Sequence, residues 1–342
     1  MGAAPGGAGG WRVSEGGQRR QLRVAIARAL RQGEGRNPGH MDPIMHAAWL
    51  WAAFTLVAAG AQTLRNATQR ELTASLGAVG ATQVRFVFGL PFAILFLAGV
   101  SLWTGLPLPA LEPSVLAWTA LGAMAQIAAT ALMLAAMDLA NFVVVTAYIK
   151  TEAVQVAIFA LAFLGERPSP SLVAAIGLAT AGVLILSLPK AGAGRAGAVP
   201  AALLGLVSAA FFALAAVGFK AAVTGLATPA FAMAASVVLV AGLAMQSFVL
   251  AIYLLVADRA GATAILVAWR ASLLAGFLGA LASQFWFLAF ALASPARVRT
   301  LALVEVLFAQ AIALLRFRER LRPLQALGMA LVVLGVIALI DG

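Results

Sequence analysis

The feature that most limits how this chain can fold is a succession of apolar runs, each about long enough to cross a membrane. A helix needs about 20 apolar residues to span the hydrocarbon core of a bilayer. Runs of this kind lie at 46–64, 79–103, 114–136, 141–164, 170–188, 199–220, 229–256, 272–293, 298–316 and 324–340. They are apolar on every face, whereas the strands of a membrane barrel alternate apolar and polar residues. The sequence therefore predicts an all-α membrane protein with ten transmembrane helices.

Composition supports this fold class. The chain is 63% hydrophobic and 10% charged, with a mean hydropathy of +0.99, whereas soluble domains are about 25% charged. A net charge of +11 could indicate nucleic-acid binding, but the positive charges lie mainly in the N-terminal tail and the short loops, where they orient a membrane protein. We expect the lipid bilayer and no nucleic acid as partner. The large excess of arginine over lysine and the absence of cysteine favour the inner membrane of a bacterium.

Residues 1–45 differ from the rest of the chain, because they are rich in glycine and arginine and contain no sustained apolar run. They are expected to form a disordered tail or to lie largely upstream of a true start at Met41. The apolar core of a signal peptide is missing. The positive charges of the tail and the loops together, among which we count Arg65 and Arg299, are nearly equal on the two sides of the membrane, whereas a start at Met41 would remove the tail charges and favour termini outside. They therefore fix no orientation.

Two segments 153 residues apart share one motif. EAVQVAIFALAFLGERPSP, from Glu152, aligns without a gap to EVLFAQAIALLRFRERLRP, from Glu305. The aligned identities include Glu152 with Glu305, Glu166 with Glu319, Arg167 with Arg320, Pro170 with Pro323 and Gly182 with Gly335. LGAMAQ from Leu121 likewise resembles LGALASQ from Leu278. The chain is thus predicted to contain two five-helix repeats, 46–188 and 199–340. An odd number of spans inverts the second repeat, an arrangement typical of secondary transporters with a site at mid-membrane.

These features together resemble the drug/metabolite transporter superfamily, EamA type. Each half has an acidic residue in its fourth helix, then a G-E-R-like turn and a glycine-containing fifth helix. The resemblance implies a secondary transporter whose helices one to four and six to nine surround a central cavity, with the fifth and tenth peripheral. Members commonly export amino acids, metabolites or toxic compounds. The proline that often follows the motif glutamate is Ala153 and Val306 here, which leaves a helix break at that place open.

Four charged residues lie away from the ends of the predicted spans: Arg85, Lys150, Glu152 and Glu305. Charged side chains are costly there and are functional candidates by default. Their signs cancel, so we expect each charge to meet an opposite one inside the bundle. Lys150 and Glu152 are two residues apart, about 200° around a helix, and do not face each other. Their partners are therefore expected on other helices.

Two roles remain open for these charges: ion pairs that stabilise the bundle, or substrate binding and coupling. Glu152 and Glu305 are duplicated, and either role suits them. Lys150 has no repeat counterpart, since the equivalent position is Leu303. This asymmetry favours a function for Lys150 and, with it, Arg85, as anchors for an anionic group or partners of a coupling carboxylate.

Several uncharged polar residues also lie within the predicted spans. They either line a cavity or form hydrogen bonds between helices; they are Tyr148, Gln126, Gln246, Gln284, Trp286 and Gln310. Tyr148 and Gln155 are expected to share one polar face with Glu152. Gly89 and Pro91 are predicted to bend the second span, and GLPLP, from Gly105, is predicted to be a loop.

The leading hypothesis is a secondary exporter of a small metabolite or amino acid that works by alternating access, with proton coupling through Glu152 or Glu305 as an option. The alternatives are a non-transporting scaffold or receptor and a membrane-embedded enzyme. The sequence has no cysteine, its only histidines are His40 and His46, and it lacks a phosphate-binding loop motif. We therefore expect no enzyme activity, cofactor or metal, a small-molecule substrate, and a monomer or homodimer.

Overall fold

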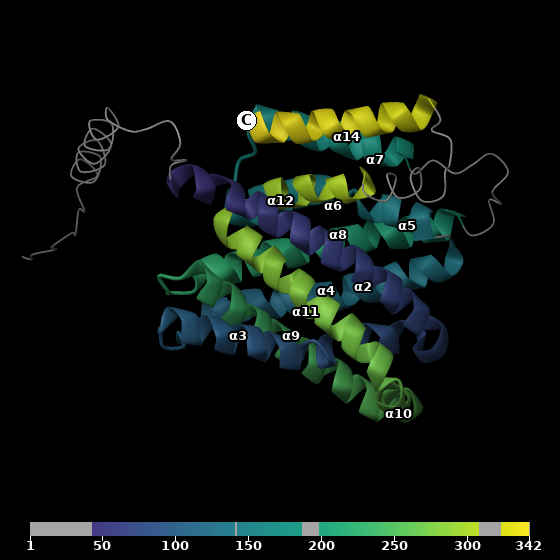
Figure 1. The fold of residues 1–342 in the computed structure, drawn as a ribbon. Coiled ribbons are helices and arrows are strands. Elements are labelled where there is room, and N and C mark those ends of the chain that lie inside the picture. Colours follow the sequence, from purple (N-terminus) through teal and green to yellow (C-terminus); the bar gives the residue numbers. More distant parts are fainter. Residues whose placement is uncertain (1–42, 141, 187–197, 308–322, 342) are drawn as a thin grey trace, which may run out of the picture. The chain divides into compact units, whose positions relative to one another are not determined.

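The computed structural model describes residues 43–140, 142–186, 198–307 and 323–341, and all regular elements in these ranges are helices (Figure 1). The chain divides into two units, Met1–Ala48 and Trp49–Gly342. Nearly all described residues belong to the second unit, which is the subject below. The expected tail 1–45 lies outside the described residues except for the helical residues 43–45.

The described elements follow one another along the chain as short and long helices. They are α2 (Pro43–Val87), α3 (Leu90–Thr104), α4 (Pro113–Leu139), α5 (Phe142–Ile149), α6 (Glu152–Phe159), the π-helix η1 (Ala160–Leu164), α7 (Pro170–Leu186), α8 (Ala198–Gly225), α9 (Phe231–Ala257), α10 (Arg259–Val267), α11 (Trp269–Leu292), α12 (Pro295–Leu301), the 3₁₀-helix η2 (Ala302–Val304) and α14 (Pro323–Asp341).

Seven stretches of the described residues are long and apolar enough to cross a membrane. They are Val79–Thr104, Pro113–Leu139, Val145–Leu164, Val199–Gly225, Phe231–Ala257, Trp269–Leu292 and Pro323–Ile340, with Pro170–Leu186 a shorter apolar helix. The first predicted run, 46–64, forms part of α2, and the ninth, 298–316, is described only as far as residue 307. The prediction of an all-helical chain with many apolar spans is confirmed for the described residues.

The first helix is longer than its apolar run. α2 continues to Val87, interrupted only at Gly77, where φ is 67° and ψ is 172°. Glycine adopts such a positive φ without the steric cost of a Cβ. The Gln69 side chain donates a hydrogen bond to the Ala81 carbonyl (2.9 Å) and ties together the two limbs that meet at Gly77. The placement of Arg65 in a loop is therefore wrong: it lies within α2 and is only 1% exposed.

The second span bends where its sequence predicted. α2 ends at Val87 and α3 begins at Leu90, with a turn between them. A Cβ on Gly89 would lie 3.2 Å from the carbonyl oxygen of Gly276 in α11. The glycine therefore allows the turn and α11 to approach each other closely. The predicted loop is also confirmed, because α3 ends at Thr104 and Gly105 caps it with a φ of 64°.

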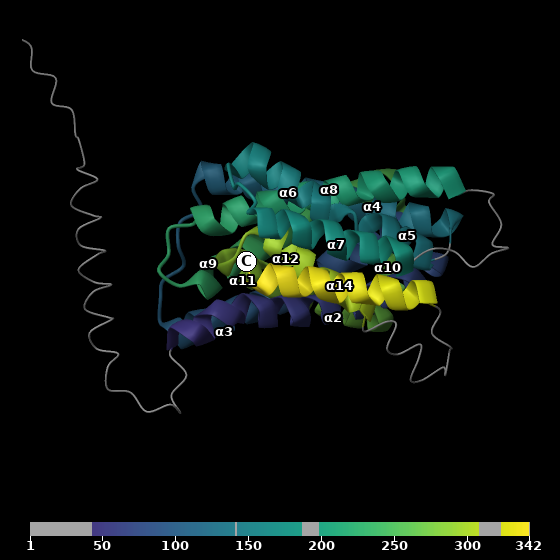
Figure 2. The same ribbon diagram turned by 90° about the horizontal axis from the view of Figure 1, so that it is seen from above.

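Helices from the two predicted halves pack against each other, so that residues 49–342 form one unit. The contacts join α4 with α8, α3 with α9, α6 with α12 and α7 with α14. α2 meets α11, where the rings of Phe54 and Phe285 lie 5.6 Å apart. Figures 1 and 2 show α7 and α14 side by side. Backbones meet at this crossing: a Cβ on Gly182 would lie 2.6 Å from the carbonyl oxygen of Gly328.

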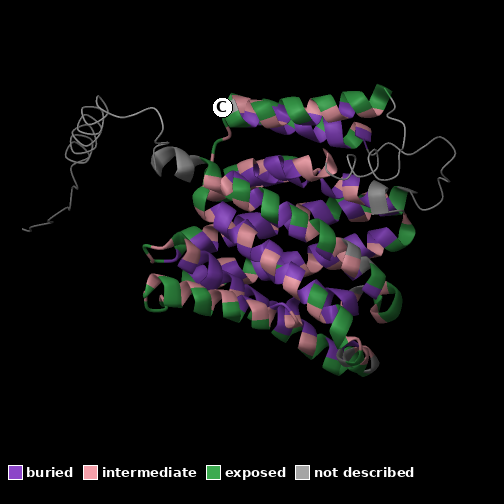
Figure 3. Ribbon diagram, in the orientation of Figure 1, coloured by how far each residue is buried: buried purple, intermediate pink, exposed green. Residues whose placement is uncertain are grey.

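Burial distinguishes the central helices from the outer ones. α4, α8 and α11 carry many buried residues, whereas α3 and α14 expose large apolar side chains along much of their length (Figure 3). Exposed apolar side chains suit a surface that faces lipid, because lipid tails are as apolar as the side chains themselves. The buried charged residues lie on α2, in the turn after α5, on α6 and on α12.

Candidate functional site

The predicted fourth helix of the first half breaks directly before its glutamate. α5 ends at Ile149, a turn holds Lys150 and Thr151, and α6 begins at Glu152. Tight i to i+3 hydrogen bonds replace the helical ones, as the Thr151 amide donates to the Tyr148 carbonyl (3.2 Å). The Thr151 hydroxyl donates to the same carbonyl (2.7 Å). Such local bonds from threonine compete with the regular helix, so the break forms without a proline.

The second half breaks at the equivalent place. α12 ends at Leu301, the 3₁₀-helix Ala302–Val304 follows, and helical residues resume at Glu305. A short 3₁₀ stretch inside a helix often marks a functional hinge. Each half therefore presents its motif glutamate immediately after a helix break.

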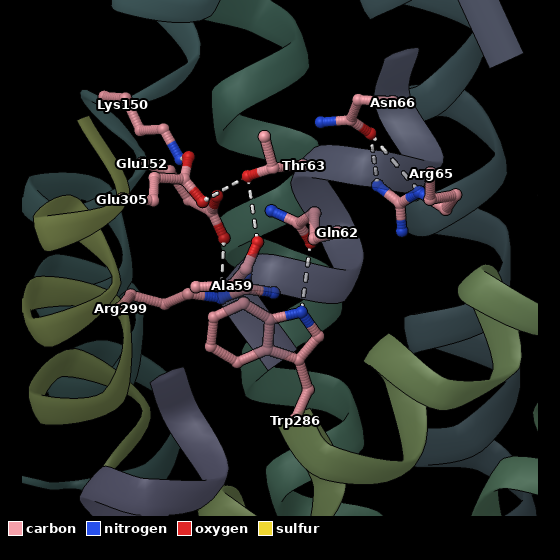
Figure 4. Close-up of polar contacts among 10 residues, drawn as sticks. All are labelled: Ala59, Gln62, Thr63, Arg65, Asn66, Lys150, Glu152, Trp286, Arg299 and Glu305. Carbon is pink, nitrogen blue, oxygen red and sulfur yellow. Dashed lines mark hydrogen bonds and ion pairs between the residues drawn. The ribbon is translucent and has the colours of Figure 1, made fainter. Parts of the chain in front are cut away.

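Two ion pairs connect these breaks, and each crosses between the halves (Figure 4). Glu152 Oε1 lies 3.0 Å from Arg299 Nε in α12. Lys150 pairs with Glu305. Both pairs are almost fully removed from solvent, with side chains 9–11% exposed. The expectation that Lys150 and Glu152 find partners on other helices is confirmed.

Aromatic and polar groups of α11 and α2 complete the cluster. The Arg299 guanidinium carbon lies 4.2 Å from the centre of the Trp286 ring, a cation–π contact that gains strength when desolvated. Trp286 Nε1 donates to Gln62 Oε1 (3.0 Å). The Thr63 hydroxyl lies 3.4 Å from Glu305 Oε2. α2 thus holds the site from the side opposite the broken helices (Figure 4).

Two further arginines are buried beside the ion pairs. Arg65 is 1% exposed and Arg85 is 2% exposed. Arg85 Nη1 donates to the Thr130 hydroxyl (3.0 Å), and Arg65 donates through Nε (3.2 Å) and Nη2 (2.6 Å) to the side-chain oxygen of Asn66. The expected balance of two positive and two negative charges is wrong. With Arg65 and Arg299 buried as well, the described residues place four cations beside two carboxylates.

A small cavity lies between these groups. Its volume is about 20 Å³, enough for one water molecule. One side is polar, and the remaining lining is mostly apolar; the residues are Gln62, Arg65, Asn66, Lys150, Glu152 and Arg299, with Thr146, Met133, Met137, Ile149 and Phe212. The cavity is therefore closed to a solute in this conformation.

Three of the predicted polar residues lie in other helix contacts. Gln126 in α4 accepts a hydrogen bond from Gln246 in α9 (2.9 Å), and Gln284 in α11 donates to Ser236 in α9 (3.0 Å). Gln284 also lines a separate, mainly apolar cavity of about 430 Å³ between α3, α9 and α11. Gln310 lies outside the described residues, as do the motif residues Glu319 and Arg320.

The expected polar face of Tyr148, Glu152 and Gln155 is interrupted by the helix break. Tyr148 lies against α8, where a Cβ on Gly205 would be 2.8 Å from its Cβ. Gln155 donates back to the Thr151 hydroxyl (3.2 Å). Glu152 alone among the three lines the cavity. The turn at Lys150 and Thr151 separates Tyr148 from Glu152, whereas Gln155 lies in α6 with Glu152.

Sequence reasoning missed Arg65 and Arg299 as site residues, together with Gln62 and Asn66. Arg65 directly follows an apolar run and Arg299 directly follows the start of another, so both were taken as loop charges. Gly77, the first glycine after Gly60, was the available signal that the first helix extends past Arg65.

Comparison with known proteins agrees with this architecture. Residues 45–188 match the EamA-like transporter family. Over these residues the match confirms the resemblance to the drug/metabolite transporter superfamily. Together with the seven candidate spans, the match indicates a multi-pass membrane protein.

A likeness in fold extends over most of the chain. A protein of known crystal structure has a TM-score of 0.64 at 16% identity, covering 86% of this chain and 97% of its own. At this identity the likeness shows the fold alone. No curated protein sequence matches the chain.

Proposed function

We propose that this protein is a secondary transporter that exports a small metabolite or amino acid across a bacterial inner membrane by alternating access. One observation carries the proposal: both halves break the fourth helix before the equivalent glutamate, and each glutamate pairs with a cation of the other half. Broken helices at the interface between inverted repeats are where transporters of many folds bind solutes.

The helix contacts support ten spans in two inverted repeats, 46–188 and 199–340. When the ten spans are counted along the chain, the contact of α4 with α8 joins the third and sixth spans, and the contact of α2 with α11 joins the first and eighth. Exchanging the two halves turns the third span into the eighth and the sixth into the first, so the α4–α8 contact becomes the α2–α11 contact. The contacts of α3 with α9, α6 with α12 and α7 with α14 are each converted into themselves. This is the pattern expected for halves related by a two-fold axis.

The crossed ion pairs provide a way to couple opening to protons. When the halves rock apart at the site, each pair must break, because its members belong to different halves. A proton that binds Glu305 removes its attraction for Lys150, and a proton on Glu152 does the same for Arg299. Protonation therefore favours separation of the halves, which is the step that admits or releases a solute.

Flux measurements test this function. The full chain is placed in proteoliposomes, and labelled amino acids and small metabolites are followed with and without a pH gradient; a metabolite comparison between a deletion strain and its parent supplies the candidates. We expect gradient-dependent flux of at least one solute. Glu152→Gln is expected to weaken the dependence on the gradient, with Glu71→Gln, an exposed glutamate of α2, as the matched control.

A folded protein that moves none of these solutes would contradict the proposal and favour a scaffold or receptor. Flux that is unaffected by the gradient in both the native protein and Glu152→Gln would leave transport standing and remove the proton coupling.

A further inference from the structure

We propose that the transported solute is a small organic carboxylate with an apolar body, and that Arg65, with Arg85 beside it, binds the carboxylate group. The inference rests on the proposed transport function and specifies its substrate class. It follows from the charges, the free donor atoms and the two kinds of wall around the closed cavity.

The charges of the cluster do not balance. Lys150 and Arg299 use both available carboxylates. Among the residues that the structure describes, no carboxylate forms an ion pair with Arg65 or Arg85, although both guanidinium groups are buried. Buried cations without a counter-charge are strongly unfavourable. A bound anion supplies the missing negative charge.

Each of these arginines also retains a donor atom without a partner in the described part of the chain. The atoms are Arg65 Nη1 and Arg85 Nε, and both are fully buried. The two other nitrogens of Arg65 donate to its neighbour Asn66. A guanidinium presents its donors in a planar fork that matches the two oxygens of a carboxylate. Arg65 lines the cavity and is therefore the primary anchor.

Gly279 of α11 allows the two arginines to lie close together. A Cβ at this position would lie 3.0 Å from Arg85 Cγ and 3.5 Å from Arg65 Cδ. Both side-chain stems therefore pass the same point on α11. Two like charges brought together in this way favour a ligand of opposite charge and disfavour a cation.

The apolar wall defines the rest of the solute. It is formed by Met133 and Met137 of α4, Ile149 of α5 and Phe212 of α8. Methionine adapts its shape to irregular apolar groups. A solute whose charged end meets Arg65 and whose body meets this wall matches both sides of the cavity. Since the cavity holds only about one water now, the solute binds when the halves are apart.

Binding to the detergent-solubilised full chain tests the proposal without requiring transport. The probes are 3-methylbutanoate, the neutral 3-methylbutanamide and the cationic 3-methylbutylamine, which share one apolar body. Ligand-dependent shifts of the unfolding midpoint, followed by tryptophan fluorescence, give the affinities. We expect the carboxylate to bind at least tenfold more tightly than the amide and the amine to cause no shift, because charge-assisted hydrogen bonds are about twice as strong as neutral ones.

Variants of Arg65 assign the anchor. Arg65→Gln is expected to weaken carboxylate binding at least tenfold, and Arg65→Lys to weaken it less, because lysine keeps the charge and loses the fork. Arg259→Gln replaces an exposed arginine outside the cluster and should leave binding unchanged. Size-exclusion profiles establish that each variant is folded. The comparison of carboxylate and amide on the native protein remains decisive if Arg65→Gln does not fold.

Three outcomes would overturn the inference: equal binding of carboxylate and amide, unchanged binding by Arg65→Gln, or no shift with the carboxylate. Tighter binding of inorganic phosphate than of the carboxylate would also overturn the assigned class. Flux measurements in proteoliposomes distinguish failure of this inference from failure of the proposed transport function. Flux of neutral solutes without carboxylate preference refutes only the present inference, whereas absence of all flux refutes transport itself.

Discussion

Gly122 in LGAM and Gly279 in LGAL occupy repeat-equivalent positions, but different groups face them. A Cβ on Gly122 in α4 would lie 2.9 Å from the Phe219 ring of α8. A Cβ on Gly279 in α11 would instead lie 3.0 Å from Arg85 Cγ, with Arg65 Cδ close by. One interface is thus filled by an aromatic ring, and the other accommodates two cations.

This difference separates what the two predicted repeats share from what they do not. The glycine and the close helix approach occur in both halves, so they belong to the framework. The arginines occur in one half and are the asymmetric element. The sequence suggested that Lys150 was the asymmetric charge, because it has no counterpart in the repeat. In the structure, however, Arg299 provides the second half with a cation of its own in the crossed pairs. Arg65 and Arg85 are therefore the charges that distinguish the two interfaces.

The largest effect is expected from Glu152→Gln. Removing this carboxylate leaves Arg299 as another buried cation beside Arg65 and Arg85, and breaking a buried ion pair from one side costs about 3–5 kcal/mol. The unfolding midpoint of the purified variant measures the loss, with Glu71→Gln as the exposed control. A variant as stable as the native protein would show that the charged interface does not depend on its carboxylates.

Alanine at the two glycines tests the comparison directly. Gly122→Ala overpacks the ring of Phe219 and should lower stability by about 1–3 kcal/mol, while the folded protein keeps its transport rate. Gly279→Ala displaces the arginines and should lower transport about tenfold or more. Flux per folded molecule and the unfolding midpoint are measured for both. The same loss of flux in both variants would contradict the division into framework and function.

Lys150→Met is expected to change transport more than stability. Glu305, its partner, can neutralise itself by binding a proton, whereas an arginine left alone stays charged. We expect a loss of about 1 kcal/mol in stability and a clear change in flux. The double variant Lys150→Met with Glu305→Leu should recover the stability and not the transport. Unfolding of the single variant would show instead that the ion pair is structural.

The smallest effect is expected from Glu166, which lies outside both interfaces in the loop before α7. Its burial raises the pKa of the carboxyl above 4.5, partly offset by the nearby Lys220. The folded protein then binds a proton more readily than the unfolded chain, so stability falls as the pH rises from 4.5 through the raised pKa. Glu166→Gln should remove this part of the pH dependence of the unfolding midpoint. An unchanged pH profile would assign the dependence to other groups.

The sequence predicted those features that depend on local chemistry. Apolar runs located the described spans, because the cost of polar groups in lipid acts on each segment by itself. The bend at Gly89 and the loop after Thr104 followed from glycine and proline in the same way. The separation of Lys150 from Glu152 required partners on other helices, and those partners are Glu305 and Arg299.

The features that were missed depend on contacts between distant segments. Apolar windows end where charges begin, so Arg65 was assigned to a loop, although α2 continues past it to Gly77. Arg299 was missed for the same reason, since its burial depends on Glu152 and Trp286 of other helices. The break before Glu152 forms through the Thr151 hydroxyl, and a search for proline does not detect it.

The crossing of α7 and α14 bears on how the two halves can move. At Gly182 and Gly328 the two backbones approach each other so closely that a Cβ on either glycine would lie within 3 Å of the carbonyl oxygen of the other. If the halves rock, a contact of this kind serves as the pivot of a lever. In the proposed motion, opening the charged cavity on one side of this pivot would close it on the other, so that a single crossing would keep the cavity from opening to both sides at once.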